Sequence, residues 1–139
     1  MSVTLTQVNS GVALAAQLFW NFTGAALANQ VLHLYTNNHA PLVTDTDADY
    51  TECALAGYAS HAVVPADWSS VTVAGGVATY TGNPITFNFA ANAGGTTIFG
   101  CYVNQGGILT MSGLLDVAFP VPAGGGSLSI SLTFNQQAC

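Results

Sequence analysis

The chain has 139 residues, of which half are hydrophobic and only 4% are charged, with no Lys or Arg and a formal net charge of -6 at pH 7. This length suits one domain with one core. Nucleic acids, anionic membranes and phosphate or carboxylate substrates are held by fixed cations, so the composition argues against all of these partners. A free monomer with so few charges would be poorly soluble. We therefore expect much apolar surface to be buried against neighbouring chains. A monomer with a neutral Ser, Thr and Asn surface is the alternative.

The first thirty residues contain two predicted elements. Residues 1–9 alternate between apolar and polar side chains, which predicts a short edge strand or an extended N-terminal arm. Residues 10–22 place Leu14 and Leu18 four apart behind Ser10, a suitable N-cap, and predict one short amphipathic helix. A buried strand is the alternative for this run, but its many Ala and Leu residues favour the helix.

The middle of the chain is expected to hold two strands around an acidic loop. The segment QVLHLYTNN, residues 30–38, is apolar on both faces and predicts a strand that is covered on both sides. Residues 39–52 contain four of the six acids and a Pro, and predict a loop or a short helical turn. The segment GYASHAVV, residues 57–64, is another candidate strand.

From Val71 onward the sequence has the alternation and turns of β structure. VTV and VATYT flank AGG and predict a hairpin. ITFNFA places its apolar residues on one face, TTIFGCYV follows after a turn, and GILTMSGLLDVAF predicts a strand pair or one long strand bent at Gly113. SLSISLTF gives the clearest alternation. The inward residues expected in these segments are Ile85, Phe87, Phe89, Leu128, Ile130, Leu132 and Phe134.

These elements define the expected fold class. Seven to nine short strands separated by Gly and Pro turns predict a mainly β fold, an antiparallel β-sandwich of immunoglobulin-like or jelly-roll-like type. The short N-terminal helix would pack on one edge or face. No repeat or long linker divides the chain, so residues 1–139 are expected to form a single domain.

Motifs that would indicate an enzyme are absent from the sequence. The chain contains no nucleophile elbow, HExxH, CxxC, Walker loop or GxGxxG. His33, His39 and His61 follow no metal-ligand spacing. His33 is expected to be a packed or hydrogen-bonded residue inside a strand, and His39 and His61 are expected to be a loop and a strand-edge residue. We therefore expect no catalytic residues and no bound cofactor. Three Cys residues leave at least one thiol unpaired, and buried free Cys is the favoured interpretation.

One acidic stretch resembles half of a calcium-binding loop. Asp45, Asp47 and Asp49 alternate as in the first half of such a loop, and Glu52 follows closely. The pattern then fails, because Tyr50 stands where the EF-hand loop requires Gly. A solvated acidic turn is the favoured interpretation, and weak Ca²⁺ binding by these four residues is the alternative.

Short motifs are spread over residues 32–134, in LHLYTNNHAP, TDTDADYTECALAGYA, TTIFGCYVNQGGIL and PVPAGGGSLSISLTF. Their succession of LYTN, YTE, GYA and PxPAGG resembles a family of small tailed-phage virion proteins. The motifs are structural, and the resemblance carries over no catalytic residue. The chain departs from the family in having no Lys or Arg, which fits a protein buried in a shell.

The resemblance implies a virion structural protein, first of all a capsid decoration or cement protein on the outer capsid surface. Its expected partners are the major capsid protein and copies of itself, arranged as a trimer, with no nucleic acid and no membrane. Trp20, Tyr35 and Trp68 are candidate interface anchors, with core packing as the alternative for each. A tail, neck or fibre component is the second hypothesis, and a carbohydrate- or surface-binding β-sandwich is the third.

Overall fold

The computed structural model describes residues 1–7, 30–91 and 94–137. The predicted helix at residues 10–22 and the candidate anchor Trp20 lie outside these ranges. The described part is mainly β, as expected. It contains no helix long and apolar enough to cross a bilayer.

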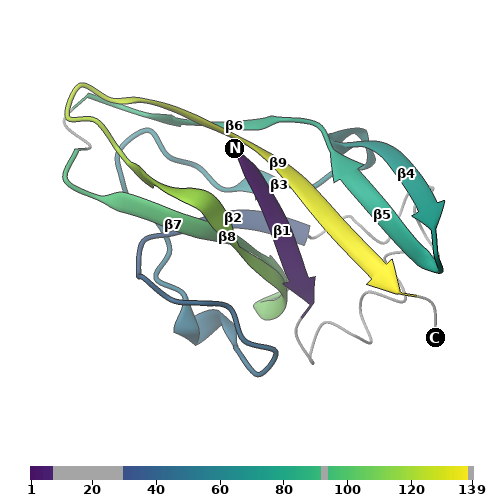
Figure 1. Cartoon of the computed structure of the whole chain (residues 1–139). Helices are drawn as coiled ribbons and strands as arrows, with labels where there is room; N and C mark the ends of the chain where they lie inside the picture. The colour runs from purple at the N-terminus through teal and green to yellow at the C-terminus, as the bar shows by residue number, and fades with distance from the viewer. Residues whose placement is uncertain (8–29, 92–93, 138–139) are drawn as a thin grey trace.

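Nine strands and two single 3-10 turns make up the described part. They are β1 (Ser2–Gln7), β2 (Gln30–Tyr35), η1 (Asp47–Asp49), β3 (His61–Ala62), η2 (Pro65–Asp67), β4 (Trp68–Ala74), β5 (Val77–Gly82), β6 (Ile85–Phe89), β7 (Thr97–Gln105), β8 (Ile108–Pro120) and β9 (Gly126–Gln137). The strands pair in the order β3-β2-β7-β8-β1-β9-β5-β4, and β6 also pairs with β9. Figure 1 shows the resulting sheet curled on itself.

The N-terminal strand lies inside the sheet and is not the predicted edge strand or arm. β1 runs antiparallel to β8 and parallel to β9, so Val3 pairs with both Leu115 and Leu132. Val3 and Leu5 are buried in the core. Alternation predicts which face of a strand is buried, but it contains no information on how many neighbours that strand has. The expectation of a free N-terminal segment is therefore corrected for Ser2–Gln7.

The long strand β9 holds the sheet together along its whole length. Thr81 of β5 pairs with Thr133, and Ile85 of β6 pairs with Ile130, so β5 and β6 follow one another along β9. All seven inward residues predicted in β6 and β9 are buried. They share one core with residues from β1, β2, β7 and β8.

Three glycines explain how the strands turn and approach one another. Gly75 and Gly76 close the predicted β4–β5 hairpin with positive φ angles of 57° and 77°, a conformation that favours Gly. Residues 108–120 form one continuous strand rather than a strand pair. Within it, a Cβ on Gly113 would lie 2.5 Å from the carbonyl oxygen of Thr4, so Gly allows β1 to come close.

A first prediction concerns Gly100 in β7. A Cβ there would meet the carbonyl oxygen of Gly113 and would lie 2.5 Å from the hydroxyl oxygen of Tyr35. We expect Gly100→Ala to lower the free energy of unfolding by about 2 kcal/mol, because these groups must shift to make room. Urea unfolding checks this, as a lower midpoint at unchanged slope.

The matched control is Gly124→Ala, since a Cβ at Gly124 meets no atom within 4 Å. We expect this variant to keep the wild-type midpoint, within about 0.5 kcal/mol. Equal unfolding midpoints for the two variants would show that the contact at Gly100 does not constrain the fold.

Candidate functional site

The outer face of strands β2, β7 and β8 carries a second cluster of buried residues. We call it the tyrosine cluster; it consists of Tyr35, Tyr50, Tyr102 and Leu109. Tyr35 and Tyr102 point away from the main core because neighbouring strand residues, such as Leu34 and Cys101, point into it. β2 is therefore covered on both faces, as its sequence predicts.

Tyr50 comes from residues 36–52, which we call the acidic loop. Its ring meets Tyr35 edge-on at a centroid distance of 4.9 Å and stacks on Tyr102 at 5.2 Å. The side chain of Asn37 joins the start of the loop to its end. It donates a hydrogen bond to the carbonyl of Asp49 and accepts one from the amide of Thr51. The loop includes the predicted helical turn, η1, which has no buried residue, while Tyr50 directly after it packs on the sheet.

Asp45 lies at the centre of this arrangement, with only 6% of its surface exposed. Its Oδ2 atom lies 2.6 Å from the Tyr50 hydroxyl, 2.8 Å from the Leu42 amide and 2.8 Å from His39 Nε2. A carboxylate only accepts hydrogen bonds, so the single hydroxyl proton of Tyr50 goes to Asp45. Ser112 Oγ, 2.9 Å from the Tyr50 oxygen, then donates its own proton to that oxygen.

These contacts determine the ionisation of the pair. Burial by itself would raise the pKa of Asp45, but the hydrogen bonds from Tyr50, Leu42 and His39 outweigh it and lower this pKa below its usual value. The pKa of Tyr50 is raised, chiefly by burial and also by its hydrogen bond to Asp45. Asp45 is therefore a charged acceptor and Tyr50 a neutral donor at neutral pH.

A second chain of contacts crosses the same face. Asn104 Nδ2 donates to Asp47 Oδ2 at 2.9 Å, which directs its Oδ1 atom to His33 Nε2 at 3.2 Å. His33 Nδ1 lies 2.6 Å from Glu52 Oε1. Both ring nitrogens of His33 thus face side-chain oxygens. The ring also stacks on Tyr102 at 4.8 Å.

All three histidines stand beside a carboxylate. Besides the two pairs on the outer face, His61 Nε2 lies 3.0 Å from Asp67 Oδ2. In a chain without Lys or Arg, imidazoles are the only side chains that can carry positive charge. The prediction that His33 is a packed or hydrogen-bonded residue is confirmed by its contacts.

The four calcium candidates are directed to different partners. Asp45 and Asp47 point to Tyr50 and Asn104, Asp49 accepts from the amide and hydroxyl of Thr46, and Glu52 points to His33. Within residues 1–7, 30–91 and 94–137, no group of three or more His, Cys, Asp or Glu is placed to hold a metal ion. One oxygen, Asp47 Oδ1, is buried without a hydrogen-bond partner in the described structure. Calcium binding stays a prediction from the sequence.

The two interface candidates that the structure describes lie inside the fold to different degrees. Tyr35 is fully buried in the tyrosine cluster, where its hydroxyl donates a hydrogen bond to the carbonyl oxygen of His39 at 3.2 Å. Trp68 is half-buried at the start of β4 and meets Tyr80 edge-on at 6.5 Å. Both contribute to packing within the chain.

The cysteines show no sign of reactivity in the described part. Cys53 and Cys101 are buried and free, as expected. Burial raises the pKa of Cys101 to about 12 and also raises that of Cys53. Both thiols are therefore protonated at neutral pH and are poor nucleophiles.

Sequence reasoning missed Ser112 and Asn104 as partners of the acidic loop. Both side chains reach it from strands far along the chain, and nothing in their local sequence marks them. The usable signal was aromatic: Tyr35 and Tyr102 lie on the faces of β2 and β7 that point away from the main core. Such a residue indicates that another segment covers that face.

Comparisons of the chain with protein-family models, with curated proteins and with solved structures find no match. The site is therefore interpreted from its geometry.

A second prediction concerns Asp45. We expect Asp45→Asn to lower the free energy of unfolding at pH 7 by about 2 kcal/mol, because the buried donors lose their charged acceptor. The folded pKa lies below the unfolded value of about 3.9, so this stabilisation is complete above that value and is lost as pH falls through the folded pKa. Urea unfolding between pH 7 and pH 2 should show a smaller acid-induced loss for the variant than for the wild type.

Asp116→Asn is the control, because within the described residues the exposed Asp116 accepts a hydrogen bond only from the amide of its neighbour Val117. It should unfold like the wild type at pH 7 and retain the same sensitivity to acid. An Asp45 variant that keeps the full acid-induced loss would contradict the role assigned to this carboxylate.

Proposed function

We propose that this chain is a capsid decoration protein that stabilises a viral shell through protein–protein interfaces. The observation that carries the proposal is the use of its ionisable side chains. Each of the six acids and three histidines holds a contact within the fold. The pairs are His33–Glu52, His39–Asp45, His61–Asp67, Asp47–Asn104, Asp49–Thr46 and Asp116–Val117. Side chains that are engaged in this way support a structural role over catalysis.

The roles of the motif residues support the same proposal. Tyr35 belongs to LYTN, Tyr50 to YTE and Gly100 to TTIFGCYVNQGGIL, three of the motifs on which the resemblance to virion proteins rests. Tyr35 contacts Tyr50, and the missing Cβ of Gly100 makes room for the Tyr35 ring. These motifs therefore specify how the acidic loop packs on the sheet, a property of a scaffold.

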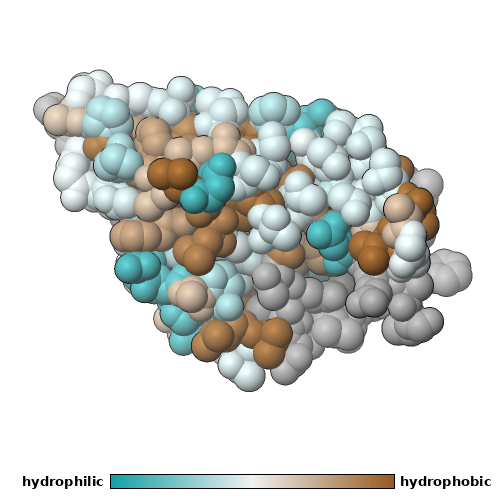
Figure 2. Space-filling view, in the orientation of Figure 1, coloured by the Kyte–Doolittle hydropathy of each residue, from teal (hydrophilic) through white to brown (hydrophobic). Residues whose placement is uncertain are grey.

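The surface supports binding through broad neutral areas. Apart from grey atoms, Figure 2 shows a face made mostly of pale and brown residues, with few strongly hydrophilic ones. The large apolar residues exposed in the described part are Met1, Leu42, Val43, Val64, Val71, Val73, Ile108, Leu114 and Val117. Contacts of this kind suit an interface between proteins.

The same surface offers little support for a carbohydrate-binding module. Such a module would present a row of exposed aromatic rings. Among the residues with described burial, every Phe, Tyr and Trp is buried or half-buried. We therefore place the glycan-binding hypothesis after the structural ones.

We propose that the curled sheet is a β-sandwich, either immunoglobulin-like or jelly-roll-like. Support comes from the core, where Leu32 and Cys101 of β2 and β7 share one cluster with Phe87 and Ile130 of β6 and β9. Two facing layers produce this kind of shared core. A compact sandwich with loops at its ends suits a protein that caps the junctions between shell subunits.

The proposed partners are the major capsid protein and copies of this chain, on the outer capsid surface. Nucleic acid and membrane lipids are not proposed as partners, because the chain has no fixed cation to meet their phosphates. A tail, neck or fibre component remains the second candidate, since it would use the same kind of neutral interface. The two differ in how many copies a particle holds.

Quantitative mass spectrometry of purified particles of the encoding phage tests the proposal. We expect the chain to be present in a fixed ratio to the major capsid protein that corresponds to hundreds of copies. A copy number matching the order of a single axis would assign it to the tail or neck instead, and absence from particles would refute a virion role.

A further inference from the structure

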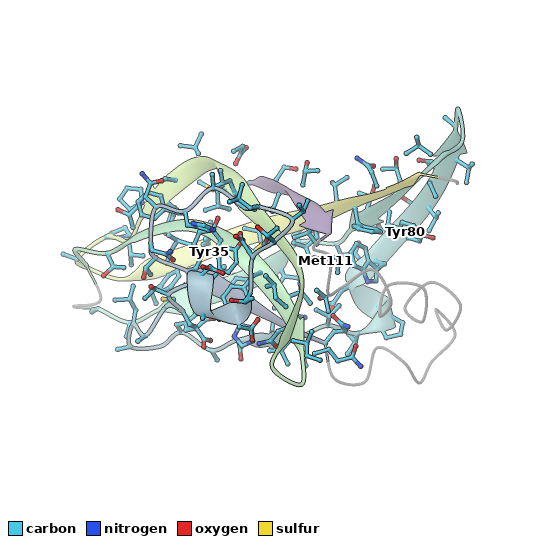
Figure 3. The ribbon with its side chains drawn as sticks, turned by 90° about the horizontal axis from the view of Figure 1, so that it is seen from below. Tyr35, Tyr80 and Met111 are labelled. Carbon is cyan, nitrogen blue, oxygen red and sulfur yellow. The ribbon has the colours of Figure 1, made fainter. Side chains whose placement is uncertain are left out.

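The strand β4 forms one end of the sheet and is exposed after its first residue, Trp68. Among the strands that the structure describes it pairs only with β5, and every residue from Ser69 to Ala74 is exposed. Val73, at 74%, is the most exposed of the large apolar residues in the described part. Figure 3 shows the β4–β5 hairpin, marked by Tyr80, reaching away from the region marked by Tyr35 and Met111.

The open edge of β4 offers unused backbone groups. The two-residue turn makes Ala74 and Val77 the closing pair of the hairpin, so hydrogen-bonding positions alternate from there along β4. The backbone groups of Val71 and Val73 consequently point to the open side. In the described structure, no backbone hydrogen bond joins residues 69–74 to any strand other than β5.

This edge lacks the usual protection against pairing. Exposed edge strands are commonly blocked by a Lys, a Pro, an inward-facing charge or a central bulge. Residues 69–74 contain no charge and no Pro, and the irregularity of β4 lies at its beginning, between Trp68 and Ser70. The strand is therefore competent to pair with another strand.

We propose that β4 pairs antiparallel with β4 of a second copy, with the two-fold axis at Thr72. In this register Val71 lies opposite Val73 of the partner copy, Thr72 opposite Thr72, and Ser70 opposite Ala74. Each pairing is reciprocal, as a two-fold interface requires, and joins side chains that are compatible in a sheet. The outward backbone groups of Val71 and Val73 then form the hydrogen-bonded pairs.

The charge distribution favours a second copy at this edge. Each chain carries a formal charge of -6, so two copies repel one another wherever their acids meet. No charged residue occurs between Asp67 and Asp116, a stretch that includes the whole β4–β5 hairpin. Asp67, the nearest acid, is already bonded to His61 and to the Val64 amide. Pairing at β4 therefore avoids placing carboxylates opposite one another.

The pairing adds one specific contact between copies to the proposed function. Its role in a shell rests on that proposed function. It joins copies in twos in solution, and on a shell it would link copies that have assembled into neighbouring trimers there. The solution experiments below report only on self-association, whereas the composition of particles reports on the virion role. Failure of one is thus distinguishable from failure of the other.

Disulfide trapping tests the register. In a Cys139→Ser background, Thr72→Cys would place two thiols opposite each other at a non-hydrogen-bonded pair, with Cα atoms about 4.5 Å apart. We expect a covalent dimer after mild oxidation. Ser70→Cys is the matched control on the same face of β4, because its Cα atoms would be roughly 14 Å apart in this register. Equal cross-linking of the two variants, or none at Thr72, would overturn the proposed pairing.

Sedimentation velocity provides a second test. The unmodified chain should sediment as a dimer, and Val73→Lys should convert it to a monomer of unchanged circular dichroism, since the charge blocks the edge. Val117→Lys adds the same charge at an exposed position in β8 and should leave the dimer intact. A monomeric wild type would contradict the proposal and would indicate that β4 pairs with a strand of a different protein. A dimer that Val73→Lys does not dissociate would also contradict the proposal.

Discussion

The fold depends on how a chain without Lys or Arg satisfies its carboxylates. A buried carboxylate needs donors, and here they must come from hydroxyls, amides and imidazoles. Asp45 collects three of them on one oxygen, from Tyr50, Leu42 and His39. Because these donors belong to the acidic loop and Ser112 binds Tyr50 from β8, the charge of one residue holds the loop on the sheet.

The tyrosine cluster converts this electrostatic need into packing. Tyr50 brings the loop between Tyr35 and Tyr102, and Gly100 leaves the space that the Tyr35 ring requires. Chemistry-bearing side chains are thereby used to build the molecule. The described part presents outward a surface with few charges and the open edge of β4, and these features suit association with other proteins.

Local pattern was enough to predict much of this fold. Alternation identified β6 and β9 and their buried residues, because a strand with one buried face repeats every two residues. The Gly pair of the β4–β5 turn was predictable because a tight turn also depends on local sequence. The position of a strand within the sheet was not predictable from local sequence. β1 was therefore expected at an edge, although two strands flank it. Tyr35 was a candidate interface anchor, and its burial was not predictable. Tyr50, which covers it, comes from a loop whose path depends on Ser112 and Asn104.

The acidic loop illustrates the same limit for the site. Asp45, Asp47 and Asp49 alternate in sequence as calcium ligands do, yet their side chains diverge to three different partners. Alternation along a loop specifies spacing, whereas convergence depends on the long-range contacts that bend the loop. The histidine pairs were likewise beyond the sequence, since His33 and Glu52 meet only once the loop has folded back.

We propose that this chain works by covering a shell built from other subunits. A cryo-electron microscopy reconstruction of the native particle tests this proposal most directly. We expect density that fits the curled sheet on the outer capsid surface where capsomers meet. A complete shell reconstruction with no such density on its outer surface would contradict it.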